Sequence, residues 1–143
     1  MNEQTIQLLN EITQNTEMAK HTAQDLAEIA QDVRLKNDLH RQVATYEDLQ
    51  NRARAMLAVD GEEPKEESAM AKMSAKMELK LKTLTDRSAK NIAGMLVEGN
   101  QMGVENMARA IRDYPAANVG AIALAQRLQH AESEYAHQME SFL

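Results

Sequence analysis

Cysteine and tryptophan are both missing from this sequence of 143 residues. The absence of cysteine excludes a disulfide framework, a thiolate metal site and a cysteine nucleophile. Five glycines and two prolines are too few for the many turns of a β-sandwich or barrel. Aromatic residues make up 3% of the chain, which is too few for a surface that stacks single-stranded nucleic acid. Thiol chemistry and turn-rich β folds are therefore excluded.

Positive charge and long apolar runs are also scarce. The 16 basic residues face 22 acidic ones, and the net charge of −6 repels phosphate backbones, so we expect no nucleic-acid partner. No apolar run approaches the ~20 residues that span a bilayer, so we expect no integral membrane association. The first residues lack the basic and apolar parts of a signal peptide, so we expect a cytoplasmic protein. The length suits a single domain over residues 1–143.

Apolar side chains recur every three or four residues along most of the chain, which is the spacing of one helix face. This spacing predicts four long helices and one short helix, over residues 3–31, 34–58, 69–83, 86–112 and 117–142. Asn2, Asp32 and Thr85 are the predicted N-caps. The second helix is predicted to end before Asp60 and Gly61.

The connections between the helices predict the topology. Tight turns join the first long helix to the second and the third to the fourth, so each pair forms an antiparallel hairpin. Residues 59–85, which include the short helix, connect the two hairpins. One long crossover between two hairpins is the ferritin-like arrangement. We therefore predict an all-α fold, a ferritin-like four-helix bundle with a short extra helix in its crossover.

Several short motifs agree with this topology: Leu8-Leu9-Asn10, Leu35-Lys36, Gly61-Glu62-Glu63-Pro64, Gly99 and Ala136-His137. With these motifs the chain resembles small bacterial ferritin-like domains, mostly of unassigned function, and the resemblance covers essentially its whole length. The wider superfamily includes iron-storage proteins, diiron oxidases and some spore-coat proteins. Membership would therefore imply the fold without implying one function.

Diiron members of that superfamily have a glutamate on each of two helices and a Glu-x-x-His pair on each of the others. Here the inward positions at mid-height form a predicted buried polar layer: Asn15, Thr16, Thr22, Gln42, Tyr46, Asn100, Glu132 and Tyr135. Glu132 is the one inward carboxylate, and Tyr135 stands where the motif requires histidine. His137 is expected to face solvent. We therefore expect no diiron centre, and Glu132 and Tyr135 are only weak candidate metal ligands.

Two interpretations of this layer remain open. In the first, its side chains fix the helix register through their own hydrogen bonds, with Tyr46 and Tyr135 donating to Glu132 and with Gln42 or Asn100 completing the network. In the second, burial raises the pKa of Glu132, which makes the residue a candidate proton carrier.

The short helix carries a row of methionines, and the third long helix carries a wide apolar arc. Together they form a candidate interaction face made of Met70, Met73, Met77, Val97 and Val104. Such a face either binds another protein chain or covers the flank of its own bundle.

Two classes of function follow. In the first, the protein is a non-enzymatic ferritin-like bundle without catalytic residues or cofactor, acting as a structural or protein-interaction module that self-associates, as a dimer. The alternative is a metal-binding ferritin-like protein, an iron-handling protein or diiron-type oxidoreductase with altered ligands and iron as its cofactor.

Overall fold

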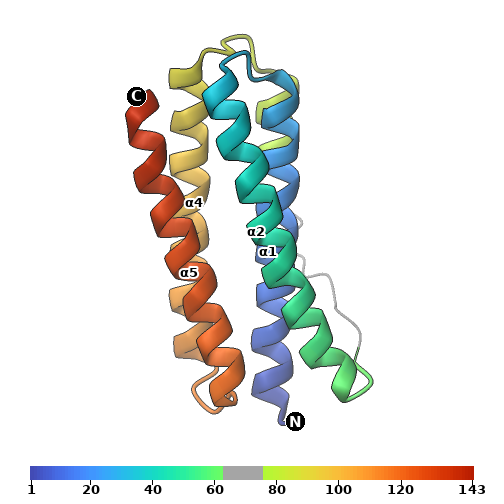
Figure 1. Cartoon of the computed structure of the whole chain (residues 1–143). Helices are drawn as coiled ribbons and strands as arrows, with labels where there is room; N and C mark the ends of the chain where they lie inside the picture. The colour runs from blue at the N-terminus through green and yellow to red at the C-terminus, as the bar shows by residue number, and fades with distance from the viewer. Residues whose placement is uncertain (63–75) are drawn as a thin grey trace.

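A computed structural model describes residues 1–62 and 76–143, and every regular element in these residues is helical (Figure 1). The elements are α1 (Glu3–Ile29), α2 (Val33–Val59), α4 (Ala89–Asp113), α5 (Val119–Met139) and the 3-10 turn η1 (Glu140–Phe142). Residues 76–82 are also helical. The predicted all-α class is confirmed. None of the helices in these two ranges is both long and apolar enough to cross a bilayer.

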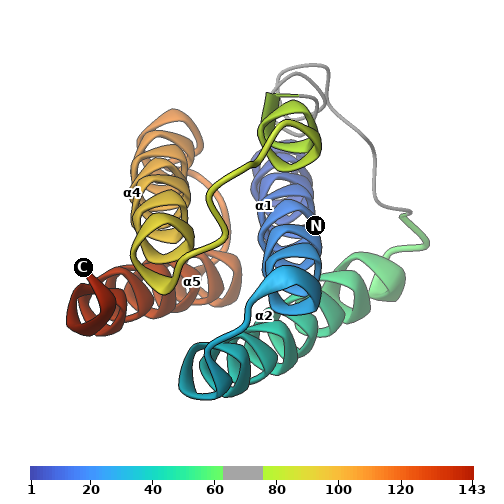
Figure 2. The ribbon, with the colours of Figure 1, turned by 90° about the horizontal axis from the view of Figure 1, so that it is seen from above.

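The long helices pair as two antiparallel hairpins, α1 with α2 and α4 with α5. Helix α1 also contacts both helices of the second hairpin, and α2 contacts α5 (Figure 2). Figure 1 shows that α2 ends at one end of the molecule and that α4 begins at the opposite end. The end of α2 and the beginning of α4 therefore lie far apart, at opposite ends of the molecule.

Three of the predicted helix boundaries are set by the expected residues. The Asn2 side chain accepts a hydrogen bond from the backbone N–H of Thr5 at 2.8 Å, and Asp32 accepts one from that of Leu35 at 2.9 Å. Both are N-caps that satisfy a donor otherwise lacking a partner in the first turn. Helix α2 ends at Val59, and Gly61 follows with φ of 72°, a left-handed conformation that glycine adopts without strain.

The other boundaries differ from the prediction. Helix α4 begins at 89 rather than 86, because its N-cap is Ser88, whose hydroxyl accepts from the N–H of Asn91 at 3.2 Å. Thr85 is therefore not the cap. Asp86 belongs to the turn before the helix, where its side chain accepts from the N–H of Ser88 at 3.0 Å. A strong cap close to an apolar row decides where a helix begins.

Small shifts occur at three further helix ends. Helix α1 ends at 29 rather than 31, because Ala30 is already extended. Helix α5 begins at 119 rather than 117, after the N-cap Asn118, and its last turn, predicted as part of the helix, is the 3-10 turn η1. Of the short helix predicted over 69–83, residues 76–82 are helical and 69–75 lie outside the described residues.

Hydrogen bonds hold the beginning of α1 against the α4–α5 connection. The Thr5 hydroxyl accepts from the N–H of Asn118 at 2.8 Å, the Asn2 amide donates to the carbonyl of Ala116 at 2.7 Å, and Gln4 accepts from the N–H of Ala116 at 2.7 Å. The two hairpins are thus joined directly at this end of the molecule.

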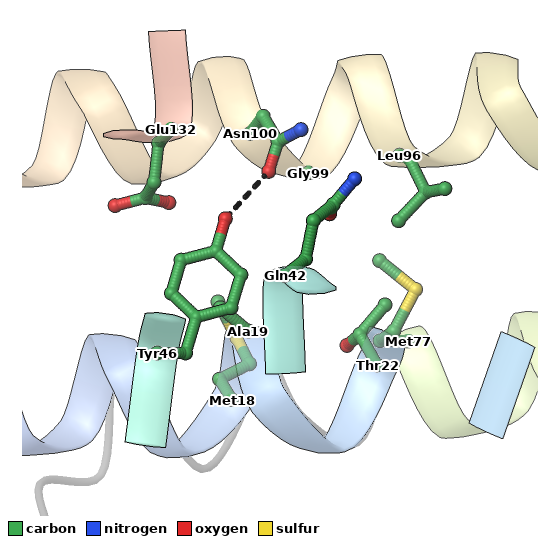
Figure 3. Close-up of a pocket in the computed structure, with 10 residues that line it drawn as sticks. All are labelled: Met18, Ala19, Thr22, Gln42, Tyr46, Met77, Leu96, Gly99, Asn100 and Glu132. Carbon is green, nitrogen blue, oxygen red and sulfur yellow. Dashed lines mark hydrogen bonds between the residues drawn. The ribbon is translucent and has the colours of Figure 1, made fainter. Parts of the chain in front are cut away.

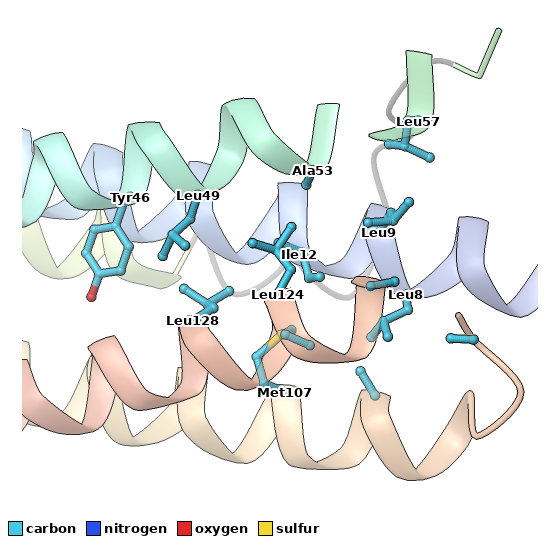
Figure 4. Close-up of a cluster of buried hydrophobic side chains, with 14 residues drawn as sticks. Leu8, Leu9, Ile12, Tyr46, Leu49, Ala53, Leu57, Met107, Leu124 and Leu128 are labelled. Atoms are coloured by element: carbon cyan, nitrogen blue, oxygen red, sulfur yellow. The ribbon is translucent and has the colours of Figure 1, made fainter. Parts of the chain in front are cut away.

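Apolar side chains from all four long helices form two separate clusters. The first, at the end that holds the N-terminus, is shown in Figure 4 and consists of Leu8, Leu9, Ile12, Tyr46, Leu49, Ala53, Leu57, Met107, Ala110, Ala117, Ala121, Leu124, Ala125 and Leu128. The second consists of Ala23, Leu26, Ala27, Ala30, Leu35, Leu39, Ile92, Ala93, Leu96, Met139 and Phe142. Along each helix, the buried residues between the two clusters are polar or small.

Candidate functional site

The buried polar layer lies between the two apolar clusters, and every long helix contributes to it. Its fully buried members are Asn15 and Thr16 of α1, Gln42 and Tyr46 of α2, Asn100 of α4 and Glu132 of α5. The other two predicted members, Thr22 and Tyr135, are half-buried at its edge. In this structure the side chains of all four long helices at this level point into the bundle.

Glu132 occupies a space that exists because Gly103 of α4 has no side chain. The Glu132 side chain is buried, with 2% of the residue exposed. A Cβ atom at Gly103 would lie 1.6 Å from Oε2 of Glu132 and 2.4 Å from its carboxyl carbon. The side-chain amide of Asn15 donates to the carbonyl oxygen of Gly103 at 3.3 Å and also hydrogen-bonds to Glu132. The carboxyl group is therefore held against the α4 backbone.

Burial raises the pKa of Glu132 to about 8, against the opposing effect of the hydrogen bond from Asn15. Removal from water penalises the ionised carboxylate, and no cation among the causes compensates for it. Burial likewise raises the pKa of the Tyr46 phenol, and the charge of an ionised Glu132 would raise it further. Both groups are therefore mainly protonated at neutral pH.

The two tyrosines bond to partners other than Glu132, contrary to the expected network. The Tyr46 hydroxyl donates to Oδ1 of Asn100 at 3.1 Å, which links α2 to α4. The Tyr135 hydroxyl donates to Oγ1 of Thr45 at 2.6 Å, which links α5 to α2. The two rings pack edge to face, with centroids 5.8 Å apart. Tyr135 therefore reaches the side of α2 and not the centre of the layer.

A cavity of about 30 Å³ adjoins the layer. Figure 3 shows the residues that line it: Met18, Ala19, Thr22, Gln42, Tyr46, Met77, Leu96, Gly99, Asn100 and Glu132. Several buried polar atoms of the layer have no hydrogen-bond partner among the described residues, namely Nε2 and Oε1 of Gln42, Nδ2 of Asn100, Oε1 of Glu132 and Oδ1 of Asn15. Native proteins leave few such atoms unpaired, so the layer has unused hydrogen-bonding capacity.

One predicted member of the layer does not link the helices. The hydroxyl of Thr16 donates to the backbone carbonyls of Ile12 and Thr13 in its own helix, at 2.8 and 3.0 Å. This local bonding satisfies a buried hydroxyl without a partner from another helix.

The side chains around Glu132 do not fit the ligand set of a diiron centre. Within residues 1–62 and 76–143, no three His, Cys, Asp or Glu side chains lie close enough together to hold a metal ion. His137 is on the surface, as predicted, with 79% of its side chain exposed beside Glu140. One carboxyl group, amides and a phenol supply too little negative charge for two iron ions.

The candidate interaction face is not a continuous exposed surface where the structure describes it. Met77 is half-buried and lines the cavity, and Val97 packs against the second apolar cluster. Val104 is half-buried beside Gln129, which donates to the Val104 carbonyl at 3.3 Å. Met70 and Met73 lie outside the described residues.

Gly103 was not among the predicted site residues, although its position held a signal. Glycine inside a helix costs about 1 kcal/mol relative to alanine, so a buried glycine at mid-helix calls for a packing reason. The close approach of Glu132 supplies that reason. Met18, Ala19 and Leu96 were likewise not predicted to line the site, because their sequence positions do not indicate which side chains border a cavity.

A family model described as "Domain of unknown function (DUF2383)" matches residues 4–113. The chain belongs to this family. The match includes α1, α2, α4 and every member of the polar layer except the two from α5, Glu132 and Tyr135. No curated protein and no solved structure matched the sequence. Function therefore has to be argued from the residues themselves.

Proposed function

We propose that this member of the family is a non-enzymatic, cytoplasmic ferritin-like bundle that serves as a structural or protein-interaction module and self-associates as a dimer. The observation that carries the proposal is the chemistry at the centre of the bundle. There, a single carboxyl group, that of Glu132, has a pKa of about 8 and is held by Asn15 and Gly103. A mainly neutral acid stabilised in this way is suited to packing and not to binding two metal cations.

The cross-helix bonds of the layer support a structural role. Asn15 bonds to Gly103 across α1 and α4, and Tyr46 bonds to Asn100 across α2 and α4. Both bonds join one hairpin to the other, and both require a single axial alignment of the helices. Buried polar bonds of this kind favour one register over its alternatives, whereas apolar contacts tolerate sliding.

The ferritin-like part of the proposal is supported by the chain path. There are two antiparallel hairpins, and α2 ends at the end of the molecule opposite to the one at which α4 begins (Figure 1). Up-down-up-down bundles have short connections throughout, whereas ferritin-like bundles have one long crossover.

A second candidate function is favoured by one specific observation. Oε1 of Glu132, Oε1 of Gln42 and Oδ1 of Asn15 are buried oxygens without hydrogen-bond partners in the part of the chain that the structure describes. Three such oxygens are possible ligands of a hard cation. The alternative is therefore an iron-handling or diiron-type protein with altered ligands, in which Glu132 would be the charged ligand.

Metal binding separates the two functions. The protein is purified without chelators, equilibrated with ferrous iron under anaerobic conditions and analysed for bound metal, together with Glu132→Gln and the surface control His137→Ala. We expect no stoichiometric iron in any of the three. Two irons per chain, or iron-dependent oxygen consumption that is lost in Glu132→Ala and retained in His137→Ala, would establish the alternative.

Self-association is tested separately by light scattering coupled to size exclusion. We expect a mass of twice the 16.0 kDa of one chain. A monomer at all concentrations would remove self-association from the proposal, and a large closed shell would favour storage.

A further inference from the structure

The cavity beside the polar layer has hydrogen-bonding groups of both kinds on its walls. Gln42 and Asn100 each present an unpartnered N–H₂ group, and Gln42 and Glu132 each present an unpartnered oxygen. Gln42 is 1% exposed, Glu132 2% and Asn100 5%, so bulk water does not satisfy these atoms. An unpaired buried polar group destabilises the folded state. Something other than the described protein atoms is therefore expected to pair with them.

The mixture of donors and acceptors selects the kind of ligand. A cation would be bound by the oxygens and would leave the N–H₂ groups unpaired, and an anion would do the reverse. Water donates and accepts at once, so it matches both sets. The size agrees, because a water molecule needs about 10–15 Å³ of cavity space and the cavity offers about 30 Å³.

We propose that this cavity is a hydration site, in which ordered water bridges the carboxyl group of Glu132 to the side-chain amides of Gln42 and Asn100 (Figure 3). The water joins α5 to α2 and α4 through the polar atoms that no direct bond pairs. This inference goes beyond the proposed structural function, because it adds a bound ligand to the layer and does not depend on self-association.

The surroundings of Glu132 fit a hydrated neutral acid. The groups that face it are Asn15 of α1, Tyr46 of α2 and Gly103 of α4. Tyr46 is the titratable member of this set, and its hydroxyl donates to Asn100 and not to the carboxyl group. A protonated carboxyl can donate one hydrogen bond to water and accept another. The neutral acid can therefore complete its hydrogen bonds with one water molecule.

A high-resolution crystal structure tests the site directly. We expect a density peak about 2.7–3.2 Å from Oε1 of Glu132 and from the nitrogen of Gln42 or Asn100, the distance of a hydrogen bond. An empty cavity would overturn the proposal. A peak with anomalous scattering at the ~2.0–2.3 Å of a coordinated transition metal would also overturn it, and would contradict the proposed function as well.

Oxygen-17 magnetic relaxation dispersion, which counts long-lived internal water, provides a test in solution. Gln42→Leu removes both unpartnered groups of that residue, and we expect it to lower the count by about one water molecule. Gln50→Leu is the matched control on the same helix: Gln50 is equally buried, but its side chain is bonded to Thr13, Glu17 and Lys20. We expect the control to keep the count.

An unchanged count in Gln42→Leu, or an equal loss in both variants, would contradict the hydration site. If Gln42→Leu does not fold, Gln42→Met gives the same comparison with a side chain of more similar length. The conservative variant Glu132→Gln retains a donor and an acceptor at this position and is expected to keep the water.

Discussion

The carboxyl group of Glu132 on α5 lies where the side chain of a larger residue at position 103 on α4 would begin. A Cβ atom added to Gly103 would be 1.6 Å from Oε2 of Glu132, far inside van der Waals contact. The acid therefore depends on the glycine for its position against the α4 backbone. The two residues act as one packing unit that joins the two helices of the second hairpin.

Gly103→Ala is expected to destabilise the protein by about 1–3 kcal/mol, as overpacking in a core does. The clash outweighs the gain of up to about 1 kcal/mol that alanine brings to a helix interior. Gly94→Ala is the matched control in the same helix, because no atom lies within 4 Å of the added Cβ. It should be neutral or stabilising. Urea unfolding of both variants measures the difference, and equal stability would contradict the packing unit.

The same clash predicts a rescue. In the double variant Gly103→Ala/Glu132→Ala the added methyl group no longer meets the carboxyl group. We expect the double variant to lose less stability than the sum of the two single losses, with a coupling of about 0.5–3 kcal/mol. Additive losses in a double-mutant cycle would show that the two residues are independent.

Stability should depend on pH through Glu132. The pKa of Glu132 is raised from an ordinary 4.5 to about 8 in the folded protein, so the folded state binds this proton more tightly than the unfolded state. Its contribution to stability is therefore fully present below about pH 4.5 and is lost as the pH rises through about 8. The loss reaches up to about 5 kcal/mol at higher pH.

Because other groups also titrate, the informative quantity is the difference between the wild type and Glu132→Gln, which has no proton to lose at this position. We expect the stability of the variant relative to the wild type to increase between pH 5 and pH 9, as measured by chemical denaturation at each pH. A difference that does not vary with pH would show that Glu132 titrates normally.

The two tyrosines offer a matched pair of hydroxyl deletions. Tyr46→Phe leaves Oδ1 of a buried Asn100 without its donor, so we expect a loss of about 1–3 kcal/mol. Tyr135→Phe removes a bond to Thr45, whose half-buried side chain keeps its hydrogen bond to the backbone carbonyl of Arg41. Its loss should stay below about 1 kcal/mol. Thermal unfolding of the two variants measures both losses. A larger loss in Tyr135→Phe than in Tyr46→Phe would show that the hydroxyl of Tyr135 contributes more to stability.

The apolar clusters predict a contrast between core and surface. Leu128 and Leu39 are fully buried, one in each cluster, and replacing either with alanine should cost about 2–5 kcal/mol. His137→Ala should change stability by less than about 0.5 kcal/mol, because its side chain is exposed. Comparable losses at all three positions in urea unfolding would contradict the assignment of helix faces.

Much of the fold could be predicted because it depends on local spacing. Apolar residues at three- and four-residue intervals identified the long helices, and Asn2 and Asp32 identified two of their starts. The boundaries near Thr85 were wrong because several residues there are good caps, and their competition depends on backbone geometry. The buried polar layer could be predicted for the same reason, because the helical period indicates which side chains point inward.

What the sequence by itself determined is therefore the inward face of each helix, including the solitary acid Glu132 and the outward His137. Only the tertiary structure decided which inward residues touch: Glu132 against Gly103, Tyr46 against Asn100, and Tyr135 turned toward Thr45. The physical reason is that the helical period fixes rotation about one axis. Contacts between helices depend in addition on axial register and separation, which side-chain packing across the whole core sets together.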